Sequence, residues 1–294
     1  MESLAQRGTV DVLGKAVGGV MEVHRLNGAL GARVNGIDWD TGPGHVLGPE
    51  VGPAVAGALA EYHVLAVEAR DMRPEQHVAL ARHFGELEHH EFFNNLGPGL
   101  EHITVLDSSR GDRSNMWHID EQFLNRPPIV TMTHAQLLPS YGGDTSFISL
   151  HAAYEALSPA MHRYLDGLTA LHDLALISEM AWQGGSGGPE QLAESLLKGK
   201  YASHPVVLVH PVTGRRALYV SPTYTRFIEG VPRPESRVVL DYLNEHVQKP
   251  EFGYRHRWEP GDLLVWDNRS VMHHAAFDFE DRRIMYRISV IEPA

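Results

Sequence analysis

The chain has no cysteine among its 294 residues. This absence excludes disulfides, iron–sulfur clusters and thiolate zinc sites, so nitrogen and oxygen atoms must hold any metal. The chain also lacks an apolar run long enough to cross a bilayer. Residues 1–11 lack the apolar core of a signal peptide. We therefore expect a cytoplasmic protein without a membrane partner.

Positive charge is also scarce. The 25 lysines and arginines face 37 aspartates and glutamates, giving a formal net charge of −12. Nucleic-acid binding favours a basic face, so we expect no nucleic-acid partner. No glycine-rich phosphate loop follows a predicted strand, so nothing supports nucleotide binding. A small molecule is the expected partner, and a homo-oligomer is compatible with the sequence.

The local patterns predict many short strands with helical decoration. The length and the apolar fraction of 43% suit one globular domain spanning 1–294. This pattern favours a β-sandwich or jelly-roll barrel over a parallel α/β sheet. Strands are expected at 63–70, 103–107, 117–123, 129–138, 144–149, 205–210, 216–220, 252–258, 262–266 and 284–291, a hairpin at 20–38, and helices at 53–62, 73–85, 150–156, 159–167, 191–197 and 235–246.

One long insertion stands out between the predicted strands. Residues 175–203 include the glycine-rich stretch 183–189. Such an insertion can be a mobile lid over a binding site or an ordinary surface loop, and both interpretations are equally open.

Two distant segments together supply a possible set of metal ligands. His118 and Asp120 lie two residues apart on the predicted strand 117–123, so their side chains would share one face. His273 lies in the second segment, after Trp266-Asp267-Asn268-Arg269. Two imidazoles and one carboxylate are the ligands of a mononuclear non-haem Fe(II) site with open positions. A single His-x-Asp pair proves little, because chance alone gives roughly one in a chain so rich in histidine.

Two arginines and a threonine add to this constellation. Arg283 and Arg287 lie four residues apart, so they face the same way on a strand. Buried arginines are costly without anionic partners, and a ligand carboxylate can supply bidentate hydrogen bonds. A pair of surface salt bridges is an equally open alternative. Thr145 offers a hydroxyl just after the predicted turn at 142–143.

These segments, in this order, resemble the taurine dioxygenase (TauD/TfdA) family of Fe(II)- and 2-oxoglutarate-dependent oxygenases. The resemblance implies a double-stranded β-helix core, also described as a jelly-roll or cupin-like barrel. It rests on Phe84-Gly85-Glu86-Leu87, Trp117-His118-x-Asp120-x-x-Phe123, Gly142-Gly143-Asp144-Thr145, His204-Pro205-Val206-Val207, His210-Pro211-x-Thr213-Gly214-Arg215, Leu218-Tyr219-Val220, Trp266-Asp267-Asn268-Arg269 and Arg282-Arg283-x-Met285-x-Arg287.

The resemblance also assigns roles to the central residues. It implies that His118, Asp120 and His273 bind Fe(II), and that Thr145 and Arg283 bind the distal carboxylate of 2-oxoglutarate. His274 follows His273 directly, so the ligand could differ by one residue, although the five-residue offset from Asn268 favours His273.

Four further residues are implied to contact the prime substrate. Arg287 would reach its anionic group, while His90 and Phe93 fall where the taurine enzyme has a substrate-binding histidine and a tyrosine. Arg113 falls where that enzyme places an acidic residue against the substrate amine. This reversal argues against taurine and favours a second anion or a polar acceptor, while Arg113 could equally point into water.

The implied activity is that of an Fe(II)/2-oxoglutarate-dependent dioxygenase. We expect it to use O2 to oxidise, most simply to hydroxylate, an unactivated C–H bond of a small anionic substrate, releasing succinate and CO2. Asp120 is present, which disfavours the halogenases that replace this carboxylate. The alternative is a cupin-like non-haem metalloenzyme without 2-oxoglutarate, which would not need Thr145 and Arg283. A non-catalytic relative would lack an intact triad.

Overall fold

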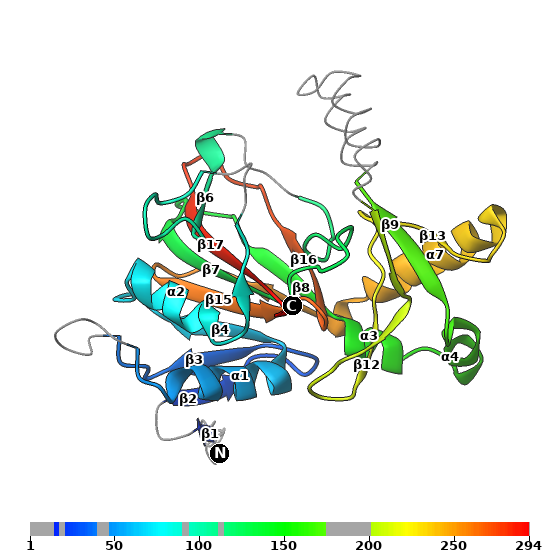
Figure 1. Cartoon of the computed structure of the whole chain (residues 1–294), viewed down its shortest axis with the longest axis horizontal. Coiled ribbons are helices and arrows are strands. Elements are labelled where there is room, and N and C mark those ends of the chain that lie inside the picture. The colour runs from blue at the N-terminus through cyan, green and yellow to red at the C-terminus, as the bar shows by residue number, and fades with distance from the viewer. Residues whose placement is uncertain are drawn as a thin grey trace, which may run out of the picture.

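The computed structural model describes residues 15–17, 21–39, 47–89, 94–110, 115–174 and 201–293. Strands dominate this part of the chain (Figure 1). The helices are α1 Val51–Tyr62, α2 Pro74–Arg82, α3 Leu150–Glu155, α4 Pro159–Leu165, α7 Arg233–Val247 and the short 3-10 turns Ser108–Arg110 and Pro250–Phe252. The strands are β1 Lys15–Val17, β2 Met21–Arg25, β3 Ala32–Asn35, β4 Val64–Glu68, β5 Glu86–Leu87, β6 Thr104–Asp107, β7 Val130–Leu137, β8 Thr145–Ser149, β9 Thr169–Asp173, β10 Tyr201–Pro205, β11 Val207–Val209, β12 Arg216–Leu218, β13 Thr225–Ile228, β14 Gly253–His256, β15 Asp262–Asp267, β16 Val271–Ala275 and β17 Ile284–Ile291.

A large sheet forms the main body of the molecule. Its described strands run in the order β1-β2-β3-β4-β15-β7-β17-β5, and β6 also pairs with β17. All these pairs are antiparallel except β3 with β4. The central strands β4 and β15 bury both faces. Leu65 and Val265 pack toward the helices, whereas Ala66 and Leu264 pack on the opposite side.

Helices α1 and α2 cover one face of this sheet (Figure 1). Val55 and Leu59 of α1 and Leu80 of α2 are almost fully buried in one apolar cluster with the sheet. Pro74 lies at the first position of α2, where a missing backbone N–H removes no helical bond. This apolar cluster also includes residues of β7 and β17, so the helices lie on the side of these strands that faces away from the candidate ligands.

A smaller sheet, in the order β14-β8-β16, lies over the other face of the large one. Phe147 of β8 is fully buried and packs with Ala66 and Leu264 of the large sheet. This apolar layer joins the two sheets at one end. At the other end, residues of both sheets line an open pocket.

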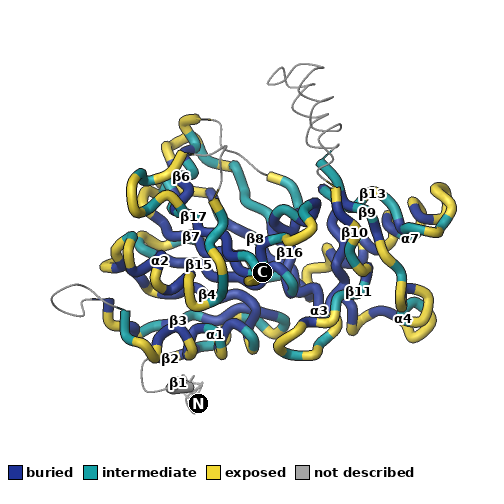
Figure 2. The backbone as a smooth tube through the Cα atoms, viewed as in Figure 1, coloured by how far each residue is buried: buried dark blue, intermediate teal, exposed yellow. Residues whose placement is uncertain are grey.

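The remaining elements form a second lobe beside the small sheet (Figure 1). Strands β9, β10 and β13 form one sheet, β11 and β12 form a hairpin, and α3, α4 and α7 complete the lobe. Its apolar core includes Leu165, Leu218 and Leu243, all fully buried. Figure 2 shows buried backbone along the strands of this lobe, whereas α4 is largely exposed. No helix in the described part of the chain is long and apolar enough to cross a membrane.

The prediction of a mainly β protein with helical decoration is confirmed, although these sheets do not close on themselves. The hairpin at 20–38 and the strand at 284–291 are also confirmed. The predicted helix 191–197 lies outside the described residues.

The predicted strand at 117–123 is wrong. Only His118 pairs with another strand, through an isolated bridge to His273, and the chain then turns. Glu121 adopts a φ of 45°, and Leu124 N–H donates to Glu121 O at 2.8 Å. A positive φ is uncommon for a residue other than glycine and interrupts a strand. His118 and Asp120 are therefore brought together by a turn, not by strand alternation.

Candidate metal centre and active-site pocket

The two histidines of the predicted triad lie on backbone segments that bond to each other. His118 N–H donates to His273 O at 3.0 Å, and His273 N–H donates to His118 O at 2.9 Å. His273 belongs to β16, the strand of the small sheet that sequence patterns did not reveal. This reciprocal pairing places the two imidazole rings 4.2 Å apart, centre to centre.

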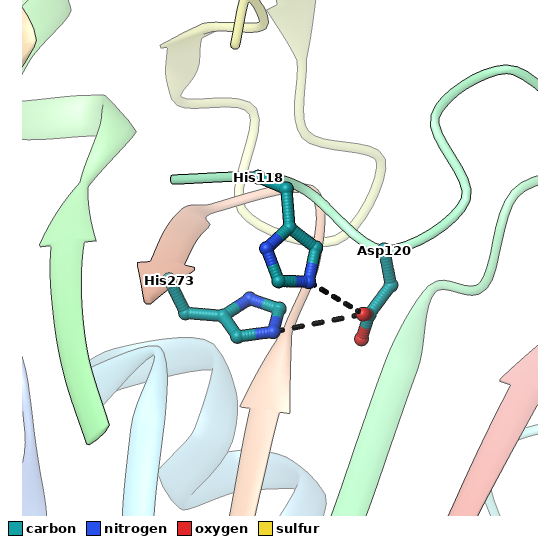
Figure 3. Close-up of side chains that lie close together, drawn as sticks. All are labelled: His118, Asp120 and His273. Atoms are coloured by element: carbon teal, nitrogen blue, oxygen red, sulfur yellow. Dashed lines mark ion pairs between the residues drawn. The ribbon is translucent and has the colours of Figure 1, made fainter. Parts of the chain in front are cut away.

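Both imidazoles face the same carboxylate oxygen (Figure 3). Oδ1 of Asp120 lies 3.5 Å from Nε2 of His118 and 3.6 Å from Nε2 of His273. These separations exceed those of an ordinary hydrogen bond. Ligand atoms about 2.1 Å from a shared ion lie about 3–4 Å apart, so the three side chains fit around one metal ion. All three are buried and their ligand atoms lie within 4.8 Å of one another.

The protonation states also suit a metal ion. His118 Nδ1 lies 2.7 Å from Met116 O, which can only accept, so Nδ1 carries a proton and Nε2 is the nitrogen left for a metal ion. Burial, with His118 nearby, lowers the pKa of His273 to about 3. Burial alone would raise the pKa of Asp120, but the Arg287 guanidinium and His273 hold that pKa well below its ordinary value. The site therefore combines a neutral His273 imidazole with an ionised Asp120 carboxylate, the states in which these groups bind metals.

The triad lines a cavity of about 190 Å³ between the two sheets. Its walls come from the facing strands of both sheets, from the 115–120 segment and from residues after β14 and β16. They are Leu106, Ser108, His118, Asp120, Thr133, Thr145, Trp258, Trp266, His273, Ala275, Phe277, Arg283, Met285 and Arg287.

One end of this pocket gathers Thr145, Trp258 and Arg283. Trp258 Nε1 donates to Thr145 Oγ1 at 3.0 Å, and the Arg283 guanidinium carbon lies 5.5 Å from the Trp258 ring centre. Arg283 Nε is buried and has no hydrogen-bond partner among the described residues. Burial lowers the pKa of Arg283 to about 10, and Asp144 opposes this shift. Because Thr145 Oγ1 accepts the hydrogen bond from Trp258, the threonine hydroxyl can donate a hydrogen bond of its own into the pocket.

Arg287 lies closer to the triad. Its Nη2 is 3.0 Å from Asp120 Oδ1, yet the alignment does not make a hydrogen bond. Nε of Arg287 is also buried without a partner in the part of the chain that the structure describes. Arg287 is thus a largely buried cation, with a side chain 15% exposed, that is paired with Asp120 and whose Nε and Nη2 make no hydrogen bond among the described residues.

The predicted geometry of the two arginines is confirmed. Arg283, Met285 and Arg287 all line the pocket, while Ile288 and Val290 pack toward α1 and α2. The alternative of surface salt bridges is wrong for this pair, although it describes the neighbouring Arg282 well: Arg282 is half-exposed and bonds to Asp107 at 2.6 and 3.1 Å.

The predicted substrate contacts His90, Phe93 and Arg113 lie outside the described residues, as does most of the possible lid at 175–203. Of that segment, only 201–203 is described, and it belongs to β10. His274 lies 5.4 Å from Trp117, ring centre to ring centre, and is not part of the ligand cluster.

Two residues of the Trp266–Arg269 segment serve the structure behind the pocket. Asp267 accepts hydrogen bonds from Arg269 and from His210 Nε2, the latter at 2.9 Å. His210 Nδ1 in turn accepts from the N–H groups of Val212 and Thr213. These contacts tie the turn before β16 to the second lobe. Sequence reasoning missed several other pocket residues, among them Trp258 and Thr133, because they do not lie in segments that resemble a ligand motif.

Comparisons with known proteins agree with this geometry. A sequence model of the family described as taurine catabolism dioxygenase TauD, TfdA matches residues 22–289. An alkylsulfatase of Acinetobacter baylyi is 30% identical over 292 residues, covering 92% of this chain and 84% of the relative. The alpha-ketoglutarate-dependent 2,4-dichlorophenoxyacetate dioxygenase of Cupriavidus pinatubonensis is 32% identical over 256 residues, covering 80% of this chain and 87% of the relative.

Solved structures are similar over almost the whole chain. A taurine dioxygenase from Burkholderia xenovorans superposes with a TM-score of 0.76 at 30% identity, covering 93% of this chain and 90% of that one. AAD-2 in complex with Mn(II) and N-oxalylglycine gives a TM-score of 0.76 at 28% identity, covering 92% and 97%. The matches support a dioxygenase that uses Fe(II), 2-oxoglutarate (alpha-ketoglutarate) and O2, not the alternative without 2-oxoglutarate. The chain belongs to the taurine catabolism dioxygenase TauD/TfdA family.

Proposed function

We propose that this dioxygenase holds Fe(II) through His118, Asp120 and His273 and hydroxylates a C–H bond of a small organic anion. The observation that carries the proposal is the pair Arg283 and Arg287. Both line the pocket beside the triad, and both have buried donor atoms without a hydrogen-bond partner in the described ranges. Two such cations require two anionic groups, one from 2-oxoglutarate and one from the prime substrate.

Arg283 is suited to the distal carboxylate of 2-oxoglutarate. A carboxylate there would accept hydrogen bonds from the Arg283 fork and from the Thr145 hydroxyl, which accepts from Trp258 and keeps its own proton to donate. N-oxalylglycine, the ligand of the similar AAD-2 structure, differs from 2-oxoglutarate only by an N–H in place of a methylene. A similar fold therefore accommodates a ligand of the same shape and charge.

Arg287 is suited to the anionic group of the prime substrate. In the described arrangement its charged partner is Asp120. A divalent ion on Asp120 would neutralise that carboxylate and repel the guanidinium, leaving Arg287 as a largely buried cation that needs another anion. The alkylsulfatase and the 2,4-dichlorophenoxyacetate dioxygenase named above act on alkyl sulfates and on an aryloxyacetate, both of which carry such a group.

The protein's own side chains bind and orient the two substrates. Fe(II), when bound, supplies the redox chemistry that couples oxidative decarboxylation of 2-oxoglutarate to substrate oxidation. Arg283 and Thr145 orient the co-substrate, and Arg287 holds the substrate anion on the same wall. The aromatic side chains of Trp258, Trp266 and Phe277 make part of the pocket wall apolar, which strengthens these charged contacts.

We also propose that the two facing sheets form the double-stranded β-helix of this family, within one catalytic domain that spans 1–294. The position of the pocket between the large and small sheets supports this arrangement. A jelly-roll barrel places ligands from several strands around one interior cavity.

Matched pairs of compounds test the anion requirement. An alkyl sulfate and the alcohol with the same carbon chain, or an aryloxyacetate and its neutral amide, are offered to the Fe(II)-loaded enzyme with 2-oxoglutarate. We expect the anion of a pair to stimulate succinate formation in the wild type and in Arg282→Ala, which removes the adjacent half-exposed arginine. Arg287→Ala should lose the stimulation. Equal stimulation by the neutral partner would contradict an anionic substrate.

A further inference from the structure

A continuous chain of buried hydrogen bonds ends on the carboxylate of the triad. Trp266 Nε1 lies 3.0 Å from Asn268 Oδ1, and Asn268 Nδ2 lies 2.9 Å from Thr131 Oγ1. Thr131 Oγ1 lies 2.7 Å from Asp120 Oδ2. The chain thus links β15, the turn after it, β7 and the ligand.

The direction of every bond in this chain is determined by its first member. An indole N–H can only donate, so Asn268 must present its carbonyl oxygen to Trp266. Its amide N–H then points at Thr131, whose oxygen accepts that bond. The one proton of the Thr131 hydroxyl is therefore left to donate to Asp120.

This bond distinguishes the two oxygens of the carboxylate. Oδ2 accepts from Thr131, whereas Oδ1 is the atom that faces both imidazoles. We infer that Thr131, oriented through Asn268 by Trp266, is a positioning residue that holds Asp120 so that Oδ1 alone binds the metal. This inference rests on the proposed metal site and adds residues to which no ligand role had been given.

Water cannot substitute for the chain. Thr131 and Asn268 are fully buried, and Trp266 and Asp120 are 4% and 3% exposed. A lost donor would leave Oδ2 without compensation in an environment where an unpaired charge-bearing oxygen is costly. Partners that orient metal ligands in this way typically contribute about 10–100-fold to metal affinity.

The test is a titration of metal-free protein with Co(II). Calorimetry measures the affinity, and the visible absorption of the bound ion reports its coordination. Thr131→Val keeps the shape of the side chain and removes the hydroxyl. We expect about 10–100-fold weaker Co(II) binding and a changed absorption spectrum, because Oδ2 is then free to coordinate. Thr131→Ser restores the donor and should restore both readings.

Thr133→Val is the matched control. Thr133 lies two residues along the same strand, lines the pocket and has no hydrogen bond to a triad residue among the described contacts. Its Co(II) affinity should match the wild type. Melting temperatures of the metal-free variants show whether Thr131→Val has lost its fold. If it has, Trp266→Phe keeps the ring and removes only the N–H that orients the chain, and a smaller loss of affinity with the same spectral change is expected.

Thr131→Val or Trp266→Phe that binds Co(II) with wild-type affinity and spectrum would overturn the positioning role. Asp120→Ala tests the proposed metal site independently of Thr131. If that variant still binds Co(II) like the wild type, the proposed metal site is wrong, and the positioning role of Thr131 is wrong with it.

Discussion

The backbones of His118 and His273 bond to each other in both directions, at 3.0 and 2.9 Å. This isolated bridge joins a loop segment to β16 and sets the two imidazoles on the same side. Two ligands that are distant in sequence are thereby fixed by main-chain geometry, before any metal ion arrives. Asp120 completes the set from the turn that follows His118.

The first prediction concerns which of two adjacent histidines binds the metal. His273 points at Asp120 Oδ1, whereas the ring of His274, the next residue of β16, contacts Trp117 in a tilted arrangement. His273→Ala should abolish binding of one equivalent of Mn(II) or Co(II), measured by calorimetry, and His274→Ala should retain it. Binding that survives in the 273 variant and disappears in the 274 variant would move the ligand by one residue.

The second prediction concerns the co-substrate. Arg283→Ala removes the charged partner of a buried carboxylate, a change that typically costs about 2–5 kcal/mol. We expect the dissociation constant of 2-oxoglutarate to rise accordingly in the metal-loaded enzyme. Arg282→Ala removes an adjacent arginine that faces Asp107 instead of the pocket and should leave that constant unchanged. Equal weakening in both variants would place the carboxylate elsewhere.

The third prediction separates Arg287 from Arg283. Arg287→Ala should bind 2-oxoglutarate almost as well as the wild type, because its donors lie beside the triad and not beside Thr145. It should produce succinate slowly and without matching oxidation of the prime substrate. The ratio of succinate to oxidised substrate measures this uncoupling, and a ratio near one in the variant would argue against a substrate-binding role.

Sequence patterns predicted the orientation of Arg283 and Arg287 correctly, but they did not predict the conformation of the segment that carries His118 and Asp120. Strand alternation predicted that Arg283 and Arg287 share one face, and both line the pocket, although Arg283 directly precedes β17 and the pairing of β17 with β7 is irregular at Ile284. The segment 117–123 carries strand-forming residues, but its conformation is set by contacts with β16 and by the turn at Glu121. Local propensity does not contain those tertiary contacts.

The supporting hydrogen bonds were also invisible in the sequence. Thr131 and Asn268 lie 137 positions apart, and Thr145 and Trp258 lie 113 positions apart. Neither pair belongs to one local motif, so only the fold shows that they meet. The surplus of histidines is partly explained in the same way: His210 bonds to Asp267, and His151 bonds to Arg216 O, both behind the pocket.

The fourth prediction concerns acid stability. His77 is 1% exposed, and both ring nitrogens lack hydrogen-bond partners within the described chain. Burial, with His134 nearby, lowers its pKa to about 3 from 6.5. Between pH 6.5 and 3, the His77 imidazole is therefore protonated in the unfolded chain but neutral in the folded protein. Its contribution to stability is full above pH 6.5 and falls by about 1.4 kcal/mol per pH unit below it.

His77→Leu should remove this dependence, because leucine has no proton to bind and no polar atom to leave unpaired. Between pH 8 and pH 5, the free energy of unfolding should fall by about 2 kcal/mol less in the variant than in the wild type. Urea denaturation of the metal-free proteins at the two pH values measures the difference. The same loss in both proteins would show that His77 is not a buried neutral group.

The most direct test of the central claim is Fe(II)-dependent conversion of 2-oxoglutarate to succinate in the presence of O2. We predict that the wild type forms succinate only when Fe(II) is supplied, faster with a small organic anion than without one. Asp120→Ala, which removes the one carboxylate of the triad, should form none. Oxidation of a small anion at an undiminished rate without 2-oxoglutarate, or undiminished succinate formation by Asp120→Ala, would contradict the account.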